Sequence, residues 1–153
     1  MQDYEHTQAG WLIRIWVGLW AVIFGGAAIF VLSTGYERSA GLVFLAIGAI
    51  LALLLALFHG LTVRVSVERV LVSFGVGLIK KSIPVERIQG AAAVRNRWYH
   101  GWGIRRIWGG WLFNVSGFDA VELQLENGRF FRVGTDEPRE LLAAVERVLE
   151  ARR

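Results

Sequence analysis

The chain has no cysteine, and over much of its length it has almost no charge. The absence of cysteine excludes disulfide frameworks, cysteine-ligated zinc or iron–sulfur sites and thiol chemistry. Charged residues make up only 20% of the 153 residues, hydrophobic residues make up 54%, and the mean hydropathy is +0.43. A globular protein of this size cannot hide so much apolar surface from water. The chain therefore either oligomerises extensively or lies partly in lipid.

The uneven placement of charge decides between these possibilities. Residues 11–58 contain three charged side chains, whereas residues 59–153 contain twenty-five. A length of 153 residues allows one domain, or one domain with a membrane anchor. The sequence therefore predicts a membrane half, residues 1–59, followed by a soluble domain, residues 60–153.

Two apolar runs in the membrane half are long enough to span a bilayer. Residues 11–32 carry a single charge and residues 41–58 carry none. At 1.5 Å per residue the first run covers the ~30 Å hydrocarbon core, and the second is near the short end of the spanning range. Residues 33–40 are too few to form a domain, so we expect an antiparallel hairpin. Small residues recur along both runs and predict close helix packing: Gly18, Ala21, Gly25 and Ala28, then Gly48, Ala52 and Ala56.

The alternative for the first run is a cleaved signal peptide. The leader carries acidic residues but no lysine or arginine, and the apolar run exceeds the usual length of a signal sequence, so we favour a retained helix. Arg14 lies one turn inside this run and can extend to the headgroups, where Trp11 and Trp16 fit an aromatic belt.

The orientation of the hairpin is predicted from its flanking arginines. Arg14, Arg64 and Arg69 lie on the side that carries both ends of the hairpin, and Arg38 alone lies at the connecting turn. The positive-inside rule then places both termini in the cytoplasm and the protein in the inner membrane.

From Leu61 the pattern changes to the alternation of a half-buried strand. Further strand candidates end at glycine or proline and lie near residues 70–75, 78–83, 87–95, 104–108, 111–116, 120–126 and 129–134. About seven short strands predict a β-sandwich or small barrel. Asn127-Gly128 lies between two alternating runs and predicts a hairpin with a type I′ turn.

A single amphipathic helix is predicted at the end of the domain. Thr135 to Pro138 supply an N-cap candidate, acidic residues for the first turn and an early proline. The apolar residues that follow at helical spacing are Leu141, Leu142, Val145, Val148 and Leu149. We expect this face to cover an open end of the β structure.

Three stretches of the soluble half resemble the bacterial pleckstrin-homology-domain membrane proteins. They are Ile83–Ile88, Gly117–Leu123 and Phe131–Pro138. Members of this family commonly carry two transmembrane helices before the domain. The resemblance implies a pleckstrin-homology-like barrel or sandwich of about seven strands, capped by a C-terminal α-helix.

Residues 95–106 contain more aromatic and basic residues than the β structure needs for its own packing. The candidate binding residues are Arg95, Arg97, Trp98, Tyr99, Trp102, Arg105 and Arg106. Arginine beside tryptophan or tyrosine suits a contact with lipid headgroups or a protein interface. The simpler interpretation is that the rings pack the core and the arginines are solvated. We expect Trp108 and Trp111 in the core and residues 97–106 on the surface.

No residue pattern predicts a metal site, a cofactor or a catalytic group. The three histidines lack the spacing of metal ligands, and the glycine pairs lack a dinucleotide-binding context. The positive charge of residues 59–153 is too dispersed to predict nucleic-acid binding.

These patterns favour a non-catalytic binding or scaffolding module, with the lipid bilayer and a membrane protein as partners. The alternatives are direct recognition of anionic lipid headgroups by residues 95–106, or an enzyme whose site assembles only in space.

Overall fold

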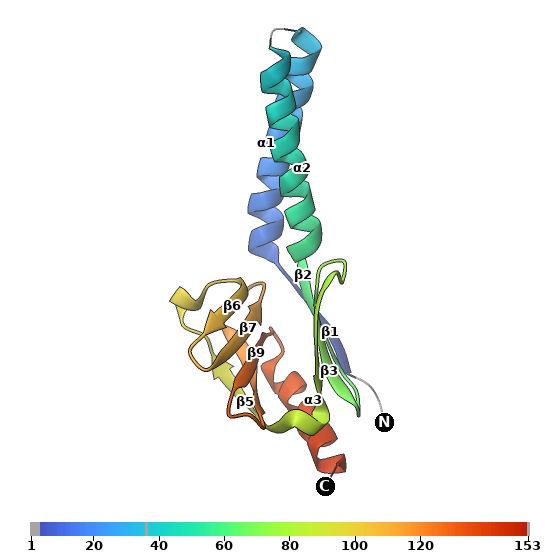
Figure 1. Ribbon diagram of the computed structural model, residues 1–153, viewed down its shortest axis with the longest axis vertical. Helices are drawn as coiled ribbons and strands as arrows, with labels where there is room; N and C mark the ends of the chain where they lie inside the picture. Colours follow the sequence, from blue (N-terminus) through green and yellow to red (C-terminus); the bar gives the residue numbers. More distant parts are fainter. Residues whose placement is uncertain (1–3, 36, 153) are drawn as a thin grey trace.

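The computed structural model describes residues 4–35 and 37–152 (Figure 1). Tyr36 of the expected turn and the C-terminal Arg153 lie outside the described residues. The α-helices are α1 (Trp11–Thr34), α2 (Arg38–Phe58) and α3 (Pro138–Ala151), and short 3₁₀ helices are η1 (Val85–Arg87) and η2 (Trp98–His100). The strands are β1 (Tyr4–Ala9), β2 (Gly60–Val65), β3 (Arg69–Phe74), β4 (Ile79–Pro84), β5 (Ile88–Arg95), β6 (Gly103–Ile107), β7 (Gly110–Asn114), β8 (Asp119–Leu125) and β9 (Phe130–Gly134).

Helices α1 and α2 form a hairpin that stands away from the β-rich body (Figure 1). Both are long and apolar enough to cross a membrane, and only 6% and 11% of their apolar windows are buried. They are therefore not core helices of the body. A Cβ added to Gly48 would lie 3.3 Å from the Gly25 N, so small residues set the closest approach of the two helices, as the sequence predicted.

The first sheet has the order β1-β2-β3-β4, with every pair antiparallel. Strand β1 was expected to be part of a tail but pairs with β2 along its whole length, from Tyr4 opposite Val65 to Ala9 opposite Gly60. The hairpin is therefore inserted between the first two strands of the sheet. The Gly10 N donates to the His59 carbonyl O at 3.0 Å and ties the two ends of the hairpin together.

Side chains of β1 also reach the start of α3. The Tyr4 hydroxyl donates to the Glu137 carboxylate at 3.4 Å, and His6 Nε2 lies 2.7 Å from Asp136 Oδ1. Burial, followed by the charge of Glu137, raises the pKa of Tyr4, which keeps its hydroxyl a donor. The N-terminal strand thus holds the last helix as well as the first sheet.

The second sheet has the order β5-β8-β9-β7-β6. Strands β5, β8 and β9 are antiparallel neighbours, whereas β7 runs parallel to β9. The turn between β8 and β9 differs from the type I′ turn that we expected. Only Gly128 has a positive φ there, at +72°, and its N donates to the Leu125 carbonyl at 3.0 Å. The chain therefore makes a three-residue loop with glycine in the left-handed position.

The core lies where the inner faces of the two sheets meet α3. Val72 and Phe74 from the first sheet, with Val121 and Leu123 from the second, are fully buried or nearly so. Leu141, Ala144, Val145 and Val148 bury one face of α3, while Leu142 and Leu149 pack at its margin. The predicted apolar face of the last helix is confirmed. The strand candidates between residues 61 and 134 are all found, each to within about two residues, and with β1 the described residues form nine strands where about seven were expected.

Candidate functional site

The end of the domain from which the hairpin emerges carries an apolar turn. Residues 75–78 join β3 to β4 and reach the base of α2 (Figure 1), where the Val76 N donates to the Ala56 carbonyl O at 3.3 Å. Gly75 has a φ of +46°, and a Cβ at this position would overlap the Ala56 carbonyl, so the approach requires glycine. Val76 and Leu78 are nonetheless mostly exposed. This turn presents apolar side chains beside the hairpin.

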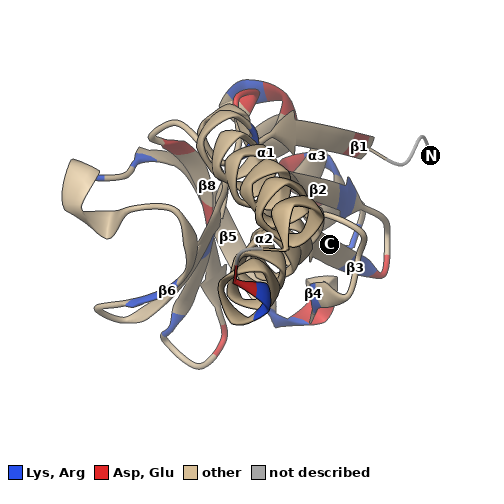
Figure 2. Ribbon diagram, turned by 90° about the horizontal axis from the view of Figure 1, so that it is seen from above, with Lys and Arg blue, Asp and Glu red and all other residues tan. Residues whose placement is uncertain are grey.

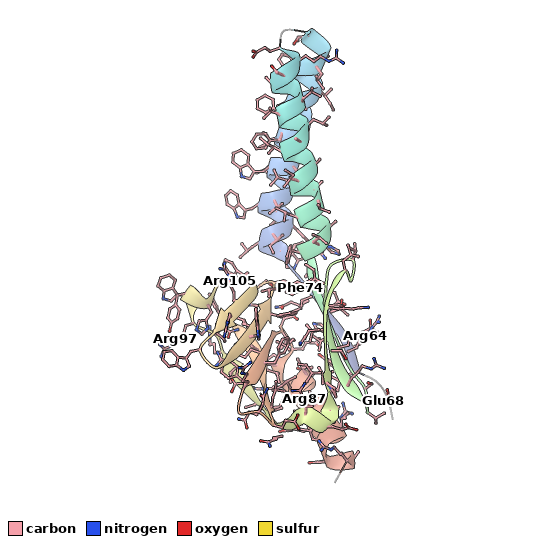
Figure 3. The ribbon with its side chains drawn as sticks, viewed as in Figure 1. Arg64, Glu68, Phe74, Arg87, Arg97 and Arg105 are labelled. Atoms are coloured by element: carbon pink, nitrogen blue, oxygen red, sulfur yellow. The ribbon has the colours of Figure 1, made fainter. Side chains whose placement is uncertain are left out.

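Basic side chains lie at the same end of the domain. Lys80 and Lys81 begin β4, where they pair with the hairpin-proximal half of β3. Figure 3 shows Arg105 of β6 just below the base of the hairpin, with Arg97 farther from it. Seen down the hairpin, basic residues flank the helices on both sides, on β6 and next to β4 (Figure 2). By contrast, Arg69 begins β3 at the end of the sheet away from the hairpin.

The segment from residue 95 to residue 103 folds over the outer face of the second sheet. Leu112 alternates with the core residue Phe113 and is fully buried, although it lies on the opposite face of β7. The segment is held at this face by Asn96, whose Oδ1 accepts from Arg132 Nη1 at 3.3 Å and whose N donates to the Phe118 carbonyl O at 2.6 Å. Arg105 Nε also donates to the Trp102 carbonyl O at 3.3 Å. The sheet thus fixes a segment that is otherwise rich in exposed aromatic residues.

A basic hollow of about 290 Å³ opens between this segment and the edge of the sheet. Arg95 and Arg97 contribute guanidinium groups, and neither has a carboxylate partner among the described residues. Arg97 donates to the Tyr99 hydroxyl at 2.8 Å and lies 5.8 Å from the centre of its ring. The remaining lining residues are His100, Ile107, Trp108, Phe130 and Arg132.

The positive charge of Arg132, at the floor of the hollow, is neutralised by a carboxylate, whereas among the described residues the charges of Arg95 and Arg97, at its rim, are not. Arg132 Nε lies 2.7 Å from Glu122 Oε2, and both side chains are less than a fifth exposed. Burial, followed by the charges of Arg132 and Arg97, lowers the pKa of His100 from its ordinary value of 6.5. His100 is therefore neutral at pH 7, and its buried Nδ1 has no hydrogen-bond partner among the described residues. The positive charge of the hollow comes from the two rim arginines, which suits an anionic group.

The structure does not bring the seven predicted site residues together in one place. Arg95, Arg97 and Tyr99 line the hollow together. Trp102 and Arg105 contact each other nearer the hairpin, through the Trp102 carbonyl. Trp98 is 81% exposed and stacks edge-on against the Tyr99 ring, and Arg106 is exposed on β6. Residues 97–106 lie largely on the surface, as expected.

The expectation that Trp108 and Trp111 pack the core is wrong. Trp108 is 99% exposed and Trp111 is 46% exposed. Both lie by the tight turn of the β6–β7 hairpin, where Gly109 has a φ of +87° and Trp111 pairs with Arg106. Strand β6 is the edge strand of the second sheet, so the β6–β7 turn is covered by no further described strand of that sheet. These two rings therefore enlarge the exposed aromatic surface.

Two parts of this surface were not recognised in the sequence. Phe130 and Arg132 reach the hollow because β9 pairs with β7 in parallel, a pairing between segments that are not neighbours in the chain. The apolar turn at Val76 and Leu78 was noted only as a strand break. The available signal was one apolar residue between two glycines, Val76, followed by Leu78 and Ile79 and then by two lysines.

Comparisons of the chain with family models, with curated proteins and with solved structures give no match.

Proposed function

We propose that this chain is a membrane-anchored, non-catalytic binding or scaffolding module, with α1 and α2 as a transmembrane hairpin and the β-rich domain at the cytoplasmic face of the inner membrane. The observation that carries the proposal is the juxtaposition, at one end of the domain, of two exposed apolar helices, an apolar turn and a set of basic side chains. Such an end suits a bilayer surface with anionic headgroups.

A retained hairpin is supported by the strand that precedes it. Cleavage after a signal sequence would remove β1, and with it the six residue pairs that β1 makes with β2. The pairing also requires both ends of the hairpin to be on one side of the membrane. Arg14, Lys80, Lys81 and Arg105 lie toward that side, against Arg38 at the far turn, which favours the cytoplasm under the positive-inside rule.

We infer further that the domain has a variant of the pleckstrin-homology-like fold. Seven strands form two antiparallel groups, β1-β2-β3-β4 and β5-β8-β9, and a single helix follows them. On this view the membrane hairpin and the β6–β7 hairpin are two insertions into the same framework. An experimental structure in which β1 does not pair with β2 would contradict the assignment.

A binding role is supported by the chemistry of the exposed segment. Guanidinium groups stay protonated at all physiological pH values, so Arg95 and Arg97 can hold an anion but cannot exchange protons with it. Glu122, the carboxylate that contacts the lining residue Arg132, is held in an ion pair with it. Exposed tryptophan and arginine are also the residue types that dominate protein interfaces.

Anchoring and orientation are tested with single cysteines, because the chain has none of its own. Ser39→Cys places a thiol at the start of α2, and Glu146→Cys places one on the exposed face of α3. We expect a membrane-impermeant thiol reagent to label position 39 in intact cells, and position 146 only after permeabilisation. Labelling at 146 alone would reverse the orientation, and labelling at both positions would exclude the hairpin.

Recognition of anionic headgroups is a second candidate, favoured by the position of Arg105 below the base of the hairpin. The test uses the full-length protein in nanodiscs of phosphatidylcholine with or without phosphatidylglycerol, with a polarity-sensitive fluorophore on Trp98→Cys. We expect phosphatidylglycerol to shift its emission to the blue, and salt to reverse the shift by screening. The same fluorophore on Glu150→Cys, at the far end of α3, is the control position.

Charge reversal identifies the residues responsible. Arg105→Glu with Arg106→Glu should abolish the shift, because each arginine adds about 1 kcal/mol of attraction to an anionic surface. The matched control is Arg139→Glu with Arg147→Glu, two exposed arginines of α3. Recognition of headgroups is contradicted if phosphatidylglycerol does not change the emission of the wild-type protein. If the Arg105/Arg106 variant also no longer captures a membrane protein that the wild type captures, the result supports the scaffolding role.

A further inference from the structure

A groove runs along one face of the helix hairpin, in the half nearer the domain. Its volume is about 880 Å³, within the range of about 300–1,000 Å³ typical of small-molecule sites. Small side chains of both helices line it, including Gly18, Ala21, Gly25, Ala49, Ala52 and Ala56. The predicted small-residue stripes therefore do more than bring the helices together, because they also leave a channel open to the outside.

The other half of the hairpin is closed. Ala28 of α1 is completely buried, and a Cβ added to Gly41 would overlap the side chain of Leu32, which fills the space between the helices. The helices meet at Gly25 and Gly48, near the middle of the hairpin. The groove therefore extends from Arg14, next to the domain, to about mid-hairpin.

One charged side chain lies in the groove, at its domain end. Arg14 Nε donates to the His59 carbonyl O at 2.8 Å, and the guanidinium lies 5.7 Å from the centre of the Trp11 ring. No carboxylate of the described residues lies within 4.0 Å of it. One of its donors is satisfied by the backbone, and an arginine this near the end of a membrane helix lies within reach of the lipid headgroups. The groove thus combines an apolar channel with an unneutralised cation at its mouth.

The length of the groove indicates how far its occupant extends. Arg14 and Gly25 are eleven residues apart on α1, which corresponds to about 16 Å along the helix axis. Half of the hydrocarbon core of a bilayer is about 15 Å. A partner helix would cross both leaflets, whereas an acyl chain occupies one. The open length and the cation at the interfacial end match a phospholipid of the leaflet next to the domain.

We propose that the hairpin groove is a binding site for one anionic phospholipid, whose acyl chain lies along Gly18, Ala21 and Ala52 and whose phosphate pairs with Arg14. The site rests on the proposed insertion of the hairpin into the membrane and is separate from the surface at residues 95–111. A lipid held there would supply the missing counter-ion and fill the channel between the helices.

The test uses the full-length protein, reconstituted in nanodiscs with equal amounts of phosphatidylglycerol and phosphatidylcholine and then released for native mass spectrometry. We expect one retained phospholipid per protein, with phosphatidylglycerol enriched about fivefold, the ratio that one arginine at an anionic surface provides. Arg14→Gln should reduce the enrichment to about one. Arg38→Gln removes the other arginine of the hairpin, at its far turn, and should leave the enrichment unchanged.

Filling the groove separates the acyl-chain contact from the charge. Ala52→Leu should remove the retained lipid of either kind, whereas Ala46→Leu, on the exposed surface of α2 outside the groove, should not. Ala49→Leu replaces Ala52→Leu if that variant fails to give a monodisperse protein. Retention of lipid in the filled variants, or unchanged enrichment in Arg14→Gln, would overturn the proposal. A lipid-free dimer of the wild type would assign the groove to a second copy instead.

The two proposals fail in different ways. A protein that does not float with nanodiscs contradicts membrane anchoring itself. A protein that inserts but retains both lipids in proportion to their abundance contradicts only the lipid site.

Discussion

The helix hairpin and the β-rich domain place their large apolar side chains differently: the hairpin exposes them, whereas the domain buries them. In the hairpin the large apolar residues, such as Ile29 and Phe30, face outward, and the contact between the helices is made by Gly48 and Ala28. In the domain Phe74 and its neighbours are buried and the charges face outward. Burial of apolar area can stabilise the domain, whereas helices that remain in lipid associate through close packing alone. The two regions should therefore respond differently to the same kind of substitution.

The largest expected effect comes from placing a charge in the core of the domain. Val145→Asp buries a carboxylate without a partner, because Val145 is 2% exposed in the apolar core. The penalty should consume most of a stability that is typically about 5–15 kcal/mol. The measurement is thermal unfolding of the detergent-solubilised protein, monitored by circular dichroism, and we expect the variant to show no cooperative transition. Ala143→Asp, on the exposed face of the same helix, should unfold like the wild type; equal effects would mean that the face of α3 is wrong.

Removal of β1 tests whether the domain depends on the chain that precedes the hairpin. Deleting residues 1–9 removes the partner of β2 and the contacts of Tyr4 and His6 with the start of α3. We expect a loss of about 2 kcal/mol or more, which corresponds to a fall in melting temperature of roughly 8–16 °C for a domain of this size. Tyr4→Phe with His6→Ala keeps the strand and should lose less. An unchanged melting temperature would show that β1 is only a peripheral addition.

A larger side chain at the helix crossing should affect the hairpin and spare the domain. Gly48→Leu places a side chain against the backbone of Gly25, and overpacking of this kind costs about 1–3 kcal/mol. The helices should separate at lower detergent concentrations, as measured by energy transfer between dyes on the two helices. Melting of the domain should not change. Ala46→Leu, exposed on the same helix, is the control, and an equal loss there would disprove the specific contact.

The smallest expected effect is a pH dependence of the stability of the β-rich domain. The pKa of His100 is lowered by burial and by Arg132 and Arg97, so the folded state takes up a proton less readily than the unfolded state. Stability is then present above pH 6.5 and decreases as pH falls below it. His100→Gln should lose less stability than the wild type between pH 7 and pH 5, measured by chemical denaturation. A larger loss in the variant would contradict the direction of the shift.

The parts of the fold that were predictable have a repeating apolar pattern. Alternation in Leu61 to Val65 and helical spacing from Leu141 to Val148 report burial directly, because the buried face is apolar. Strand β1 gave no such signal. Its inward side chains include His6, whose Nε2 lies 2.7 Å from Asp136 Oδ1, and Gln8, whose Nε2 donates to the Ser116 carbonyl O, so polar contacts take the place of an apolar pattern.

The candidate site was predictable only in its local part. Arg95, Arg97 and Tyr99 are close in the chain, and one short 3₁₀ turn is enough for all three to line the same hollow. Phe130 and Arg132 arrive through a parallel strand pairing, which no local pattern encodes. The tryptophans at positions 108 and 111 were misplaced because ring size alone does not distinguish the core from the tip of a hairpin.

The insertion of the hairpin between β1 and β2 has a consequence for biogenesis. Tyr4 and Val65 are partners in the sheet although both apolar helices are synthesised between them. If the hairpin spans a membrane as proposed, the sheet can close only when both ends of the hairpin are on the same side. A chain with one helix misinserted would leave β1 across the membrane and β2 as an open edge, a state prone to aggregation. In the proposed arrangement, completion of the first sheet would thus report that both ends of the hairpin are on one side of the membrane.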